Sequence, residues 1–121
     1  MTVTPREMAE HQLRMVRERS ARIAALREKV RSELPDIVAD LRRNFFVRRI
    51  VVFGSFARGE VHERSDLDLA VEGLPAKDYY RAVAACLSAS VPVDLIRIED
   101  APDALRSRIE KEGKILLEDP R

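Results

Sequence analysis

The stretch that decides the fold is RRIVVFGSFARGEVHERSDLDLAV, residues 48–71. Residues 48–53 form a short run rich in β-branched apolar side chains that Gly54 closes, and this pattern predicts a buried strand. Residues 66–71 alternate polar and apolar side chains, which predicts a second strand. Residues 55–65 are mostly polar, so we expect a short turn or helix there, followed by a loop. The two predicted strands are therefore joined by a segment suited to polar chemistry.

Three aspartates on the predicted strands are candidate metal ligands. Residues two apart in a strand face the same side, so Asp66 and Asp68 are expected to project together. Two carboxylates held at such a short distance repel each other unless a cation lies between them. Mg²⁺ is a suitable cation, because it binds carboxylates together with substrate phosphates. Asp94 lies in a third predicted strand, residues 92–98, where a charge within a buried apolar strand needs a partner. A metal shared with Asp66 and Asp68 would supply that partner.

The glycine turn after the first strand is a candidate phosphate site. Gly54 lets the backbone pass close to a ligand, and Ser55 follows with a hydroxyl and exposed N–H groups. Taken singly, a Gly-Ser turn is usually only a turn, a pair of aspartates on a strand is usually solvated, and Asp94 could be an edge-strand residue. Their conjunction in this order predicts two-metal phosphoryl chemistry on a nucleoside triphosphate.

The N-terminal third of the chain predicts a long amphipathic helix. Thr4, Pro5 and Glu7 form a helix start with the pattern of a capping box. Pro35 should end or kink the helix, so we predict two helices, over about residues 5–33 and 35–44. The apolar stripe recurs every seven residues, at Ala9, Val16, Ile23, Val30 and Ile37.

The C-terminal half predicts helices between strands. Residues 76–89 read as a helix, and another helix starts at 101–103 and stops at Gly113. Residues 115–117 form a short final strand or a packed tail. The fold class expected from this order is α/β, with one small sheet and covering helices.

Composition narrows the class further. The chain has 121 residues, 45% apolar and 36% charged, which is typical of one folded domain and excludes disordered, collagen-like and membrane classes. The single cysteine, Cys86, cannot form an internal disulfide, and no secretory leader is visible, so we expect a cytoplasmic setting. Residues 1–49 hold twelve Lys or Arg and seven Asp or Glu, whereas residues 50–121 are acidic on balance. This asymmetry suggests an acidic partner for the front half or an ordinary solvated surface.

The motif pair resembles the nucleotidyltransferase superfamily that includes DNA polymerase β. The residues that carry the resemblance are Gly54-Ser55, Gly59, Ser65-Asp66-Leu67-Asp68-Leu69 and Val93-Asp94-Leu95. The short length and the segment from Ala104 to Leu116 are similar to the minimal nucleotidyltransferase (MNT) branch, the antitoxins of HEPN–MNT toxin–antitoxin pairs. The resemblance covers about residues 36–118. It implies a polymerase β-like core with a small mixed sheet over residues 35–121, preceded by a helical extension over residues 1–34.

The resemblance also implies an activity. A protein of this family would transfer AMP from ATP to a cognate HEPN toxin, typically on a tyrosine, with two Mg²⁺ ions. Gly54 and Ser55 would hold the triphosphate, Asp66 and Asp68 would ligate both metals, and Asp94 would complete the catalytic metal. Arg58 and Ser65 match motif positions: Arg58 could touch phosphate and Ser65 could order the loop.

Two other functions remain open at this stage. The same fold could neutralise a toxin by binding alone, although three converging aspartates favour an enzyme. The arginine-rich front helix could bind nucleic acid, but its arginines are spread around the helix, which argues against this as the main role. A helix of about 29 residues would be roughly 43 Å long and would overreach its own domain. Its stripe is therefore expected to pack on the toxin or on a second copy of the chain, with a helix folded back along its own domain as the alternative.

Overall fold

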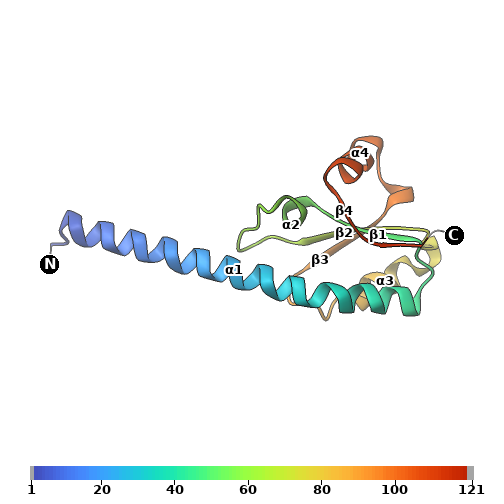
Figure 1. Ribbon diagram of the computed structural model, residues 1–121, viewed down its shortest axis with the longest axis horizontal. Helices are drawn as coiled ribbons and strands as arrows, with labels where there is room; N and C mark the ends of the chain where they lie inside the picture. The colour runs from blue at the N-terminus through green and yellow to red at the C-terminus, as the bar shows by residue number, and fades with distance from the viewer. Residues whose placement is uncertain (1, 120–121) are drawn as a thin grey trace.

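The four strands form one mixed sheet with the order β3-β2-β1-β4 (Figure 1). The strands are β1 (Arg49–Phe53), β2 (Leu67–Glu72), β3 (Val93–Arg97) and β4 (Lys114–Glu118). β1 pairs antiparallel with both β2 and β4, and β2 pairs parallel with β3. The protein is described by a computed structural model over residues 2–119. The expected small mixed sheet is confirmed, and residues 115–117 belong to a strand.

The N-terminal third is a single helix, α1 (Pro5–Asn44), which is 40 residues long. It begins as the sequence predicts: the Glu7 amide donates to Thr4 Oγ1 at 3.1 Å, and the Thr4 amide donates to Glu7 Oε2 at 3.3 Å. The predicted break at Pro35 is wrong, because α1 runs through that residue.

The packing of α1 explains why Pro35 does not end the helix. A proline inside a helix removes one backbone hydrogen bond and crowds the preceding turn. Leu34 and Ile37, on either side of Pro35, both pack against the same apolar cluster, and Leu41 one turn later is buried in it. Pro35 itself is exposed. Tertiary packing on both sides therefore outweighs the local cost.

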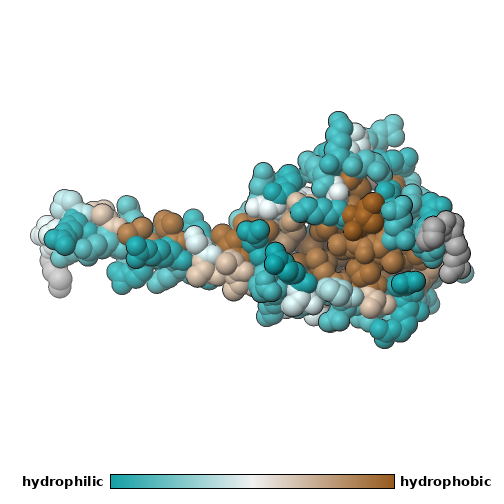
Figure 2. Space-filling view, in the orientation of Figure 1, coloured by the Kyte–Doolittle hydropathy of each residue, from teal (hydrophilic) through white to brown (hydrophobic). Residues whose placement is uncertain are grey.

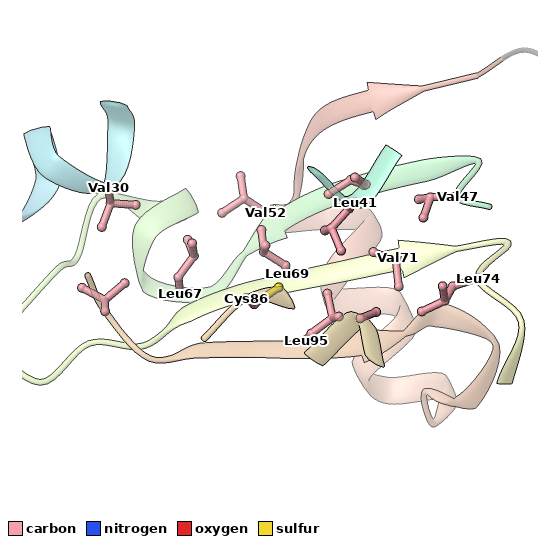
Figure 3. Packing of buried hydrophobic residues seen from close by; sticks show 13 residues of the cluster. Val30, Leu41, Val47, Val52, Leu67, Leu69, Val71, Leu74, Cys86 and Leu95 are labelled. Carbon is pink, nitrogen blue, oxygen red and sulfur yellow. The ribbon is translucent and has the colours of Figure 1, made fainter. Parts of the chain in front are cut away.

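Helices cover both faces of the sheet. On one face, the second half of α1 and α3 (Tyr79–Ala85) enclose the larger apolar cluster, whose members include Val30, Leu69 and Leu95 (Figure 3). On the other face, α2 (Gly54–Arg58) and α4 (Asp103–Glu112) lie beside the sheet, and a smaller cluster joins Phe53 to Ile109. The sheet is thus buried on two sides, as expected for an α/β sandwich.

The helix predicted over residues 76–89 is shorter in the structure. A 3₁₀ turn, η1 (Ala76–Asp78), leads into α3, and another 3₁₀ turn, η2 (Ile98–Asp100), follows β3. Cys86, just after α3, is a free thiol buried in the core. The chain after Cys86 turns toward β3, so the residues from 86 to 89, which the sequence pattern predicts to be helical, do not extend α3.

The first half of α1 projects away from the body of the molecule (Figures 1 and 2). Every described residue up to Arg22 is exposed, whereas Val30 is 2% exposed. The expectation that the helix overreaches its own domain is therefore confirmed. No helix within residues 2–119 combines the length and the apolar character needed to cross a membrane.

Candidate active site

The glycine turn after β1 lies directly against one of the predicted aspartates. Gly54 has a φ of 71° and starts α2. A Cβ atom at this position would lie 2.1 Å from Asp68 Oδ2, a distance that no side chain can occupy. Only glycine combines this left-handed backbone with so close an approach. Gly54 and Asp68 are separated in the sequence, but the fold brings the glycine turn into direct contact with the Asp68 carboxylate.

The strand register brings the predicted aspartates together. Asp68 is opposite Phe53 on β1 and opposite Asp94 on β3, while Asp66 lies one residue before β2. Burial raises the pKa of the Asp68 carboxyl, and the negative charges of Asp94 and Asp66 raise it further. The three carboxylates therefore form one electrostatically coupled group.

The prediction that Asp94 is buried within an apolar strand and needs a charged partner there is wrong. In the structure β3 is an edge strand and Asp94 is exposed. Its charge is hydrated, so desolvation does not demand a metal. What places Asp94 at the site is the parallel register of β3 with β2.

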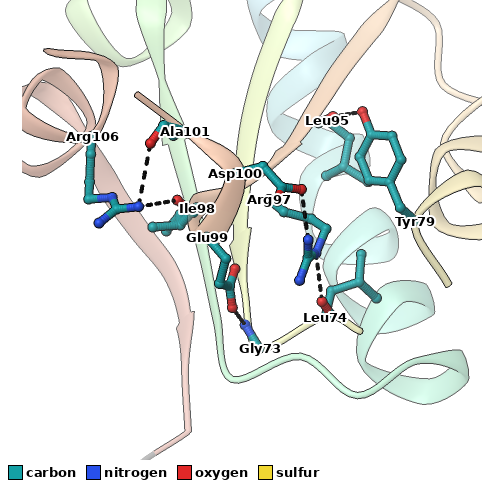
Figure 4. Close-up of polar contacts among 10 residues, drawn as sticks. All are labelled: Gly73, Leu74, Tyr79, Leu95, Arg97, Ile98, Glu99, Asp100, Ala101 and Arg106. Atoms are coloured by element: carbon teal, nitrogen blue, oxygen red, sulfur yellow. Dashed lines mark hydrogen bonds and ion pairs between the residues drawn. The ribbon is translucent and has the colours of Figure 1, made fainter. Parts of the chain in front are cut away.

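Polar contacts around β3 hold that register (Figure 4). The Tyr79 hydroxyl donates to the Leu95 carbonyl at 2.6 Å. Arg97 Nε donates to the Leu74 carbonyl at 2.8 Å, and the Gly73 amide donates to Glu99 Oε2 at 2.8 Å. These bonds join the end of β3 to the segment after β2. They fix the edge strand whose other end carries Asp94.

The two predicted serines have different surroundings. Ser65 is 5% exposed, and its Oγ accepts a hydrogen bond from the His62 amide at 2.9 Å. This contact orders the loop immediately before Asp66. Ser55 is half-buried in α2, and within the described chain its hydroxyl has no hydrogen-bond partner. Ser55 is therefore available to a ligand, whereas Ser65 is used by the loop.

Two cations face the carboxylate group. The charges of Arg58 on α2 and Arg108 on α4 both act to lower the pKa of Asp68, against the larger raising effects. Arg58 already donates to Glu60 Oε2 at 2.9 Å and to Glu112 Oε2 at 3.1 Å. No sequence motif marks Arg108, because it lies forty residues beyond Asp68 in an ordinary helix. Only the packing of α4 over the sheet brings it near.

The carboxylate group fits a hard cation only in part. Its oxygen donors suit Mg²⁺, and mutual repulsion within the group would be relieved by a positive ion. Within residues 2–119, however, no set of three or more His, Cys, Asp or Glu side chains that could hold a metal ion is found. Mg²⁺ typically keeps waters and substrate phosphates as ligands. The residues therefore fit a metal that arrives with a nucleotide.

A strand that ends in a glycine turn, followed by one aspartate just before β2 and a second aspartate within β2, is an arrangement typical of a nucleotidyltransferase site. The family model "Polymerase beta, Nucleotidyltransferase" matches residues 36–121. The chain belongs to this family.

Within this family, the chain is similar to protein adenylyltransferases and to a chain of a toxin–antitoxin structure. MJ1215 of Methanocaldococcus jannaschii, provisionally named a protein adenylyltransferase, is 41% identical over 59 residues, which cover 46% of this chain and 69% of that protein. The protein adenylyltransferase MntA of Thermococcus cleftensis is 47% identical over 45 residues, which cover 37% of this chain and 46% of MntA. A crystal structure of a toxin–antitoxin with AMP-PNP contains a chain with a TM-score of 0.60 and 26% identity. That match covers 70% of this chain and 73% of the other.

Proposed function

We propose that this protein is an antitoxin enzyme that transfers AMP from ATP to a HEPN-family toxin and thereby neutralises it. The acceptor is a side-chain hydroxyl, for which we propose tyrosine. Its oxygen attacks the α-phosphorus of ATP, the bond to the β-phosphate oxygen breaks, and pyrophosphate leaves. The hydroxyl proton passes to a carboxylate of the site. The family supports nucleotide transfer, and the similar toxin–antitoxin structure with AMP-PNP supports the donor and the type of acceptor.

The observation that carries this proposal is the contact of the Gly54 turn with Asp68. It places a backbone turn suited to phosphate beside a carboxylate suited to a metal. We propose that Gly54 and Ser55 bind the triphosphate and that Asp66, Asp68 and Asp94 hold one or two Mg²⁺ ions. Bound Mg²⁺ would neutralise charge on the transferring phosphoryl group.

The cationic residues have a role in the same proposal. Arg58 and Arg108 carry positive charge to the rim of the carboxylate group, where a triphosphate brings negative charge. Arg58 would exchange one of its bonds to Glu60 and Glu112 for a phosphate oxygen. Ser65 supports the site indirectly, because it orders the loop that leads to Asp66.

The test is a mass measurement on the acceptor. A cognate HEPN-family protein is incubated with the protein, ATP and Mg²⁺, and its intact mass is recorded. We expect mass increments of one AMP moiety, with the modified residue located by peptide sequencing, and no increment when Mg²⁺ is chelated. An unmodified acceptor, tightly bound and inactive in a complex, would instead indicate neutralisation by binding alone.

A further inference from the structure

One face of α1 carries a continuous apolar line from the projecting half into the body. The residues of this line are Leu13, Val16, Ile23, Leu34 and Val38. Their successive spacings of three, seven, eleven and four residues place them on the same side of the helix. Leu13 is 50% exposed and Val16 is 60% exposed. Nothing in residues 2–119 covers this part of the line.

Where the line reaches the body it enters a groove. A hollow of about 770 Å³ lies between the second half of α1 and β4, and its apolar lining includes Leu34, Val38 and Leu117. β4 is an edge strand, and its Ile115 side chain is 54% exposed. Figure 2 shows apolar atoms gathered over the body of the molecule, with smaller apolar patches along projecting α1. We call the line and the groove together the docking surface.

The groove leads toward the active site. A second hollow of about 340 Å³ shares Leu34 and Leu116 with the first and reaches Arg58 and Gly59 at the C-terminal end of α2. The helix also touches the loop before Asp66, because Arg22 Nη2 lies 2.8 Å from Glu63 Oε1. A molecule held on the docking surface would therefore be held beside the site.

The flank of the docking surface is basic. Arginines spaced eleven, fourteen and eleven residues apart share one side of α1 next to the apolar line, namely Arg6, Arg17, Arg31 and Arg42. Arg31 lines the groove, and so do Arg42 and Arg43. The ion pairs of Arg6 with Glu10 and of Arg31 with Glu28 are exposed and weak, so these cations remain available.

We propose that the docking surface binds an acidic helix of the acceptor protein through that helix's apolar face, and so presents the acceptor to the active site. The acceptor is the partner assigned under the proposed function, so the inference rests on that function. A second copy of this chain is a poorer occupant. In an antiparallel pair of α1 helices the arginine flank would lie against itself, and like charges oppose such an association.

Two double variants test the docking surface, and a third serves as the matched control. Leu13→Asp with Val16→Asp places charges in the exposed apolar line. Arg31→Glu with Arg42→Glu reverses the flank. Arg14→Glu with Lys29→Glu makes the same change in net charge on other sides of α1. Calorimetry measures the affinity for a cognate HEPN-family protein, and steady-state kinetics measure KM and kcat for AMP transfer to it.

We expect the first two variants to weaken acceptor affinity and raise the acceptor KM about tenfold or more, with kcat and ATP affinity unchanged. The control should stay within about twofold of the wild type. If the wild type transfers AMP but both docking variants keep its KM, the docking surface is wrong and the proposed function stands. If the wild type transfers no AMP, the proposed function itself fails. A dimer of the free protein that dissociates in the Leu13→Asp, Val16→Asp variant would overturn the acidic occupant in favour of a second copy.

Discussion

At the scale of single residues, the fold holds the carboxylates of Asp66, Asp68 and Asp94 near enough to repel one another. Burial and the charges of Asp94 and Asp66 raise the pKa of Asp68, and the Gly54 turn lies against the same carboxylate. The folded protein therefore binds the Asp68 proton more tightly than the unfolded chain does. It follows that ionised Asp68 destabilises the nucleotide-free protein as the pH rises above the carboxyl's ordinary value.

Asp68→Asn should accordingly stabilise the nucleotide-free protein at neutral pH. We expect thermal unfolding to shift upward by a few degrees at pH 7, because the substitution removes one of the repelling charges. The gain should shrink toward zero below pH 3.8, where Asp68 is protonated in both states. A melting temperature that falls at pH 7, or a gain that persists unchanged in acid, would mean that Asp68 is held by favourable contacts.

A substitution of Asp94 tests whether this residue acts in ATP binding or in AMP transfer. If it helps to hold the catalytic metal and accept the hydroxyl proton, Asp94→Asn should slow AMP transfer by about 10²-fold or more, roughly 3 kcal/mol of transition-state stabilisation. ATP affinity, measured by calorimetry, should change much less, since in our proposal the Gly54 turn holds the triphosphate. Because Asp94 is exposed on an edge strand, the fold should be unaffected. Equal losses of affinity and turnover would show that Asp94 serves binding only.

At the scale of elements, α1 shows where sequence patterns succeed and fail. The capping box at Thr4 and Glu7 is a local signal that acts within one turn, and it predicts the start of the helix correctly. Pro35 is also a local signal, but its effect depends on how the helix residues around it pack against the sheet. The strands around Gly54 are predicted well because their apolar patterns are short and closed by clear breaks.

Pro35→Ala isolates the local cost that packing overcomes. The substitution restores one backbone donor inside α1 and removes the clash of the proline ring with the preceding turn. The substitution also raises the conformational entropy of the unfolded chain, which reduces the stabilisation by about 0.4–1 kcal/mol. We expect a net stabilisation of about 1 kcal/mol in urea unfolding. Destabilisation would indicate that the proline shape itself is needed in the groove beside β4.

The parts of the site that the sequence could not predict depend on contacts between distant elements. Asp66, Asp68 and Gly54 lie within one motif, so their proximity follows from two strands and a turn. Arg108 reaches the site only through the packing of α4, and no spacing rule links it to Asp68. The exposure of Asp94 depends on β3 being an edge strand, which strand order decides and a single strand's pattern does not.

At the scale of the whole molecule, the protein consists of a folded body and a projecting helix half. We propose the division into an extension, residues 1–34, and a catalytic domain, residues 35–121, as a functional one, since α1 itself runs without a break across it. Residue 1 and residues 120–121 lie outside the described part of the chain. Val30 is buried in the core, so an extension removed for testing must end well before it.

Deletion of residues 1–18 should leave the body intact. The described residues in this segment are all exposed, and the contacts of Arg19 and Arg22 with Glu63 are retained. We expect the unfolding free energy to change by less than about 1 kcal/mol and ATP affinity to stay at the full-length value. Affinity for the acceptor should fall. A truncated protein that unfolds much more easily would show that the projecting helix half stabilises the body.

The most direct test of the central claim is the rate of label transfer from α-labelled ATP to the HEPN-family acceptor by Asp66→Asn, Asp68→Asn protein. Folding is checked by circular dichroism, and the wild type is run beside it with Mg²⁺. The account predicts that the wild type labels the acceptor and releases pyrophosphate, whereas the folded double variant gives no labelling above background. Labelling by the double variant at the wild-type rate would contradict the assignment of this carboxylate group as the active site.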